Sequence, residues 1–94
     1  MKIIWSPMAK KRLDTVISYL EAEWTSKEIL RLEKNLQGFL GKISKYPNSC
    51  PSTKNNKALR KGLVDKNNYI VYRIKTKELL EIVNFRGTKQ RPLY

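Results

Sequence analysis

The stretch from Asn67 to Tyr94 constrains the fold of this 94-residue chain most, because it contains two β-rich runs in close succession. The runs at 69–74 and 79–85 consist mainly of β-branched, aromatic and other apolar residues, and a short polar segment separates them. That pattern predicts an antiparallel β-hairpin. The second run leads into residues 86–92, where three cations precede a proline that cannot continue a strand ladder. The sequence therefore predicts a sheet that ends in a basic tail.

The loop length sets the expected register of this hairpin. With residues 76–78 in the loop, one face pairs Arg73 with Glu81, Val71 with Val83 and Tyr69 with Phe85. The other face is mainly apolar and carries Ile70, Tyr72, Ile74, Leu80, Ile82 and Asn84. This second face is expected to pack on the core, because a slip of one residue would move its side chains into water. The face of Arg73 and Glu81 is expected to stay partly open.

Helical periodicity predicts two helices before the hairpin. Apolar residues recur every three or four positions from 7 to about 24, and a serine before Pro7 suits an N-cap. Thr25 and Glu28 then fit a capping box, which begins a second helix that ends before Pro47. Two helices joined this tightly are expected to form a hairpin whose apolar side packs on the sheet.

Shorter segments complete the expected order. Residues 2–5 and 57–64 are typical of strands, 47–56 of a surface loop and 65–68 of a turn. The prediction is an α+β fold of order β-α-α-β-β-β, an antiparallel sheet packed on a helical hairpin, in one domain over residues 1–94. Four aromatic side chains are expected in its core: Trp5, Trp24, Phe39 and Tyr46.

The composition limits the partners and the chemistry. The chain has 20 Lys and Arg residues against 8 Asp and Glu, a net charge of +12, which favours nucleic acid, an anionic membrane surface or an acidic protein as partner. Histidine is absent and Cys50 is the only cysteine, so the pattern indicates no disulfide, no structural metal site, no histidine-dependent nucleophile and no cofactor. No apolar run approaches the about 20 residues of a membrane span, and a cytosolic protein is expected.

A basic and aromatic set at one end of the expected sheet is the candidate site. Its members are Lys57, Arg60, Lys61, Tyr69, Arg73, Arg86, Lys89, Arg91 and Tyr94. Guanidinium groups can clamp a phosphate, and a tyrosine can stack on a base or transfer a proton. The same groups can instead dock acidic side chains of a protein. The residues alone leave both alternatives open.

Several segments together resemble a known family. The opening WSPMAKKRLDTVISYLEAEW at 5–24 combines a Trp-Ser cap with a helix that carries a Tyr-Leu pair. A proline-containing loop then leads to a strand with Arg60, followed by YIVYRI at 69–74 and the exit RGTKQRP at 86–92. From about Lys2 to Tyr94, the chain is similar to toxins of the RelE/ParE superfamily of type II toxin–antitoxin systems.

The resemblance implies a growth-inhibiting toxin that an acidic, partly disordered cognate antitoxin neutralises by folding on it. ParE-like members act on DNA gyrase, whereas RelE-like members cut messenger RNA in the ribosome. The ParE-like branch is favoured for two reasons. Tyr69 stands where RelE-like nucleases generally have an arginine, and residues 86–92 resemble the ParE ending.

Each branch implies different roles for the candidate residues. As a metal-independent endoribonuclease, the chain would use as catalytic residues Arg60, Arg73, Arg86 and Tyr94. As a gyrase inhibitor, it would bind its target or antitoxin through Lys57, Arg60, Lys61, Tyr69, Arg73, Arg86, Lys89 and Arg91. A non-toxic basic RNA-binding module is the third hypothesis.

Overall fold

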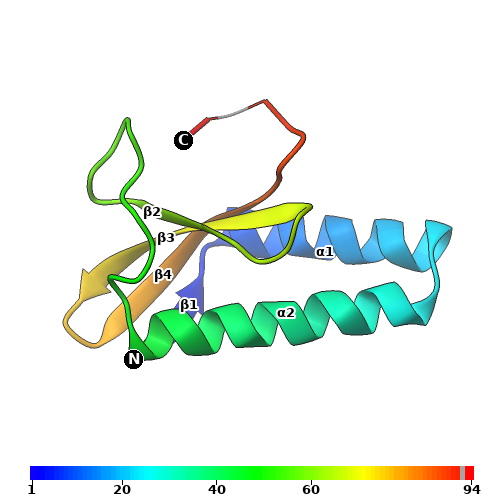
Figure 1. The fold of residues 1–94 in the computed structure, drawn as a ribbon, viewed down its shortest axis with the longest axis horizontal. Coiled ribbons are helices and arrows are strands. Elements are labelled where there is room, and N and C mark those ends of the chain that lie inside the picture. Colours follow the sequence, from blue (N-terminus) through cyan, green and yellow to red (C-terminus); the bar gives the residue numbers. More distant parts are fainter. Residues whose placement is uncertain (92) are drawn as a thin grey trace.

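The computed structural model describes residues 1–91 and 93–94, and it has the expected order of elements (Figure 1). These are β1 (Lys2–Trp5), α1 (Pro7–Glu23), α2 (Ser26–Lys45), β2 (Arg60–Leu63), β3 (Asn68–Thr76) and β4 (Leu79–Gly87). The α+β class is confirmed. The expected role of Pro92 in ending the strand lies outside the described residues. No helix in the described part of the chain is long and apolar enough to cross a membrane.

Both helices begin where their capping residues predict. The Ser6 hydroxyl accepts a hydrogen bond from the backbone N–H of Ala9 at 3.0 Å, and Pro7 occupies the first turn of α1. Thr25 and Glu28 form the capping box of α2. The hydrogen bond from the Thr25 hydroxyl lowers the pKa of the Glu28 carboxyl, because it stabilises the charged form. The two helices therefore follow each other with only a sharp bend between them.

The sheet is mixed, not wholly antiparallel as expected. Its strand order is β1-β4-β3-β2, with β1 parallel to β4 and the other two pairs antiparallel. The tight turn after β3 dictates an antiparallel hairpin. β1 is connected to the sheet only through the two helices, so no short turn fixes its direction. Pairing beside β4 places β1 at one edge and β2 at the other.

The hairpin register is as expected near the turn and shifted beyond it. Arg73 pairs with Glu81 and Tyr72 with Ile82, but Val71 pairs with Asn84 and Tyr69 with Arg86. A β-bulge at Val83 causes the shift, so the expected pairs of Val71 with Val83 and of Tyr69 with Phe85 are wrong. The bulge exchanges the faces of the residues that follow it. Phe85 turns into the core, and Asn84 lies on the opposite face.

The core lies between the helices and one face of the sheet. It contains Ile70, Tyr72, Leu80, Ile82 and Phe85 from the sheet, Ala9, Leu32, Phe39 and Ile43 from the helices, and Cys50. Phe39 meets Tyr72 edge to face, with ring centroids 6.4 Å apart. Cys50 belongs to a loop, as expected, but its side chain is buried in this core. The hairpin residue Ile74 is 40% exposed, so its expected place in the core is wrong.

Two of the four aromatic residues expected in the core are exposed. Phe39 is buried and Trp5 packs partly against the core, whereas Trp24 is 55% and Tyr46 57% exposed. Figure 1 shows why Trp24 is exposed: the bend between α1 and α2, where it lies, is well beyond the strands. The helices are longer than the sheet that they cover. Their apolar stripe therefore continues past the last strand residue that could bury it.

The Tyr72 hydroxyl donates a hydrogen bond of 2.7 Å to the backbone oxygen of Pro47, which ties the loop after α2 to the core. Tyr72→Phe is expected to lower the free energy of unfolding by about 1 kcal/mol at pH 7, because this bond is lost.

Burial and the neighbouring Cys50 raise the pKa of Tyr72 from 10.0 to about 12. The unfolded chain therefore releases this proton at a lower pH than the folded chain, and the Tyr72 contribution to stability is lost as the pH rises from 10 to 12. Urea unfolding at pH 7, 9.5 and 11 checks both effects; an equal alkaline loss in wild type and variant would contradict the second.

Candidate functional site

The face of the sheet turned away from the helices carries four of the nine expected site residues, which are Lys61, Tyr69, Arg73 and Arg86. The strand register places on this outer face Lys61, Tyr69, Val71, Arg73, Glu81, Asn84 and Arg86. At the β2 end, Tyr69, Val71, Asn84 and Arg86 are all buried, and the C-terminal residues contact this part. At the turn end, Arg73 remains exposed. The outer face is thus half covered and half open.

Arg86 is the most unusual of these residues, since its cation is 8% exposed. Its Nε donates to the Tyr69 hydroxyl at 3.1 Å, and its Nη2 donates to the backbone oxygen of Arg91 at 2.8 Å. Within the described residues the only ion pair is between Arg73 and Glu81, with 2.6 Å between nitrogen and oxygen. Two neutral oxygens therefore hold the buried guanidinium, and no carboxylate compensates its charge there.

Tyr94 and Lys61 lie in the same cluster. The Lys61 ammonium donates to the backbone oxygen of Tyr94 at 3.2 Å and lies 5.4 Å from the centre of the Tyr69 ring. The Asn84 amide donates to the Tyr94 hydroxyl at 3.2 Å. Asn84 was not expected here, because without the bulge it would point into the core. A polar residue among the apolar residues of a buried strand was the only sequence signal for it.

The remaining members of the expected site are not brought to this cluster. Arg60 pairs with Tyr72, which places it on the helix side, where it donates to the backbone oxygen of Cys50 at 2.5 Å. Arg73 binds Glu81 at the turn end of the outer face. The side chains of Lys57, Lys89 and Arg91 are exposed in the segments before β2 and after β4. The expected single constellation is therefore split into three parts.

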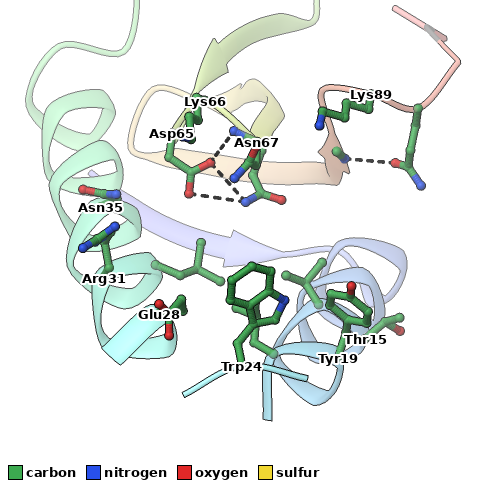
Figure 2. A pocket seen from close by; sticks show the side chains of 16 residues that line it. Thr15, Tyr19, Trp24, Glu28, Arg31, Asn35, Asp65, Lys66, Asn67 and Lys89 are labelled. Atoms are coloured by element: carbon green, nitrogen blue, oxygen red, sulfur yellow. Dashed lines mark hydrogen bonds between the residues drawn. The ribbon is translucent and has the colours of Figure 1, made fainter. Parts of the chain in front are cut away.

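A second surface, which the sequence analysis missed, is a groove beside the helical hairpin (Figure 2). We define the hairpin groove by Val16, Leu20, Trp24 and Leu32 from the helices, the turn at 65–68, and Lys89 with Gln90 after β4. Its volume is about 1050 Å³. The sequence signal for it was the length of the apolar stripe on the first helix, which exceeds what short strands can cover.

The chemistry of these surfaces favours binding. Among the residues described, no group of three or more Cys, Asp or Glu side chains lies together as a metal site would require. Two nitrogens of Arg86, Nε and Nη2, donate to Tyr69 and Arg91, and the Nε of Arg73 donates to Glu81. The outer face carries the positive charges of Lys61, Arg73 and Arg86 beside the Tyr69 ring, which suits contact with an anionic surface.

Comparison with known families shows to which family the chain belongs. A family model described as ParE toxin of type II toxin-antitoxin system, parDE, matches residues 3–92. The chain belongs to the ParE toxin family. The superfamily resemblance of the sequence is thereby confirmed. No curated protein matches the sequence significantly.

The ParE-family fold also appears in a solved structure. The chain is similar to the YoeB/ParE toxin from Agrobacterium tumefaciens, with a TM-score of 0.69 and 13% sequence identity over 93% of this chain and 98% of that chain. At this identity the likeness shows the shared fold. Toxins of such systems pair with a cognate antitoxin, so this ParE-family chain is one member of a toxin–antitoxin pair.

The Tyr69 hydroxyl connects Arg86 to the third strand. Tyr69 lies early in β3, where RelE-like nucleases generally have an arginine, and its hydroxyl accepts the hydrogen bond from Arg86. The tyrosine thus holds Arg86 against the sheet, whereas a second arginine at this position would repel it.

Proposed function

We propose that this ParE-family toxin acts in the cytosol and inhibits growth by binding DNA gyrase, until its acidic cognate antitoxin neutralises it. The observation that carries the proposal is the sequestration of Arg86, whose guanidinium is buried between Tyr69 and the backbone of Arg91. A ribonuclease needs its cations free to reach the phosphate whose charge grows in the transition state. An Arg86 that is committed to the fold supports a protein-binding mode of action.

The separation of the other candidate residues supports the same proposal. Arg60 lies on the helix side and Arg73 is paired with Glu81, so neither converges with Arg86 on one substrate atom. Catalysis would require these groups within hydrogen-bonding distance of one phosphate. Binding needs only exposed positive charge, which Lys57, Lys89 and Arg91 supply.

One observation favours a ribosome-dependent mRNA endonuclease as the second candidate. Lys61, Arg86 and Tyr94 lie together on the outer face, and a cation pair beside a phenol could serve phosphate cleavage. In this case Arg86→Ala and Tyr94→Phe are expected to reduce cleavage of ribosome-bound message by a factor of about 100 while antitoxin binding persists.

The purified toxin, freed from antitoxin, is expected to block DNA supercoiling by gyrase and to leave ribosome-bound message intact. Arg91→Glu is expected to raise the toxin concentration for half-inhibition by about tenfold, because it reverses a charge at the rim of the proposed surface. Lys10→Glu, on the exposed side of α1, is the matched control and is expected to change it less than about twofold.

Unhindered supercoiling together with cleaved message would overturn the proposal in favour of the nuclease. A non-toxic RNA-binding module, the third hypothesis, predicts normal growth when the chain is expressed without any antitoxin. Arrested growth is the result expected of the toxin.

A further inference from the structure

The charge of this chain is distributed unevenly over the fold. Five of its eight carboxylates belong to the helices, which are Asp14, Glu21, Glu23, Glu28 and Glu33. Residues 46–94 form the loop after α2, the three later strands and the C-terminal residues, and they contain 11 Lys and Arg against 3 Asp and Glu. The sheet half therefore carries most of the net charge of +12. A field this concentrated attracts anions to that half of the molecule.

One cluster of cations comes from three separate parts of the chain. At the end of the molecule opposite the α1–α2 bend, the β3–β4 turn lies beside the N-terminus and the last turn of α2 (Figure 1). Two hydrogen bonds hold these parts together. The Met1 amino group donates to the Ser44 hydroxyl at 3.1 Å, and the backbone N–H of Lys2 donates to the backbone oxygen of Glu78 at 3.0 Å. We define the turn-end surface by the four exposed lysines of these segments, which are Lys2, Lys45, Lys75 and Lys77.

These four lysines outnumber the carboxylates beside them. Glu78 lies in the β3–β4 turn and is exposed, and Glu81 forms its ion pair with Arg73. Like charges that are held close together repel one another, and this repulsion lowers the stability of the folded state. The fold nevertheless brings lysines from positions 2, 45, 75 and 77 to one end of the molecule. Binding of a polyanion offsets that repulsion.

The side chains of the turn-end surface determine which polyanion fits it. Lysine ammonium groups are compact point charges that bind phosphates one at a time, and phosphate contacts carry no sequence information. Single-stranded nucleic acid is instead bound in grooves with aromatic rings on which its bases stack. Tyr46 is exposed next to Lys45, but the Lys45 ammonium lies over its ring, 5.6 Å from the centre. A lysine cluster at the end of a molecule suits the regularly spaced phosphates of a duplex.

We propose that the turn-end surface binds the phosphate backbone of duplex DNA. The contact is electrostatic and independent of base sequence, and each of the four lysines neutralises one phosphate. The inference deepens the proposed function, because gyrase holds DNA and a toxin bound to the gyrase–DNA complex contacts both. Its biological setting rests on gyrase being the target. The DNA contact itself belongs to this chain alone and is measured without gyrase.

Fluorescence anisotropy of a labelled duplex of about 30 base pairs tests this contact on the full-length chain. Over about 50 to 200 mM salt, the logarithm of the binding constant is expected to fall with a slope of about −3 to −4 against the logarithm of the salt concentration. The double change Lys75→Gln with Lys77→Gln is expected to make this slope shallower by about 2, because two phosphate contacts are lost. It is also expected to weaken binding at about 100 mM salt by at least about tenfold.

A matched double change separates the position of the charges from their number. Lys27→Gln with Lys34→Gln removes two exposed lysines from α2 and leaves the same net charge as the first double change. Lys34 precedes Lys45 by 11 residues in this helix, so both positions lie about 16 Å or more from it along the helix axis. The control is expected to change DNA affinity less than about twofold. Far-UV circular dichroism checks that every variant is folded.

Two results would contradict the inference. Equal weakening by the two double changes would mean that net charge, and not the turn-end surface, binds the duplex. Tighter binding of single-stranded RNA or of polyglutamate than of the duplex would make one of these polyanions the occupant.

The supercoiling assay separates this inference from the proposed function. A toxin that inhibits gyrase but gives either contradicting result would remove the DNA contact and leave the proposed function in place. A chain that binds duplex DNA as expected and does not inhibit gyrase would contradict the proposed function alone.

Discussion

Gly62→Val is expected to lower the free energy of unfolding by about 3 kcal/mol, the largest effect of any single change considered for this chain. Gly62 lies in β2 opposite Ile70, so a side chain there would point into the core. A Cβ atom would lie 2.6 Å from the Cys50 sulfur and 2.8 Å from the Phe39 ring. Neither neighbour can move freely, because both are buried. Thermal denaturation followed by circular dichroism is expected to show a melting temperature lower by more than about 10 °C.

Matched changes separate this clash from a general effect of replacing glycine. Gly38→Ala and Gly41→Ala lie in α2, where an added Cβ would meet no atom within 4 Å. Each is expected to stabilise the protein by up to about 1 kcal/mol, because alanine favours the helix.

In a double-mutant cycle, Cys50→Ala is expected to recover part of the loss caused by Gly62→Ala. Strict additivity of the two changes would show that the sulfur is not what opposes the new side chain.

The elements of this fold follow from local rules, which is why the sequence predicts them well. The caps at Ser6 and Thr25 and the short turn after β3 are each set by residues close in the chain. The strand 57–64 was expected to be longer than the observed β2. Its first residues instead form a turn in which the Asn56 side chain accepts from the backbone of Ala58. Local hydrogen bonds of this kind compete with the sheet.

The errors come from features that depend on distant residues. The bulge at Val83 reverses the faces of Asn84 and Phe85, and the polar Asn84 within an apolar strand is the one local signal of it. The direction of β1 depends on its pairing with β4, 77 residues later in the chain. The exposure of Trp24 depends on where the sheet ends. For the same reason the sequence indicates candidate site residues by type, but it does not predict their division between the two faces of the sheet.

Two arginines lie on the same face of the sheet, Arg86 buried and Arg73 exposed. Arg86→Met is expected to lower the free energy of unfolding by about 2 kcal/mol, because the Tyr69 hydroxyl and the Arg91 carbonyl lose their donor in a buried place. Arg86→Lys keeps the charge but, with one ammonium in place of the planar fork, is expected to restore only one of the two hydrogen bonds and about half of the loss.

Arg73→Met is the matched control for Arg86→Met, since it removes the same side chain from a neighbouring strand. The Arg73 side chain is 45% exposed, and water screens its ion pair with Glu81. Its loss is therefore expected to cost no more than about 0.5 kcal/mol in urea unfolding, and less at high salt. Hydrogen exchange adds a local measurement, because Arg86→Met is expected to accelerate exchange at Gln90 and Arg91 while Arg73→Met leaves it unchanged. Equal losses for the two variants would mean that the buried guanidinium contributes no more than a surface charge and that Arg86 is not committed to the fold.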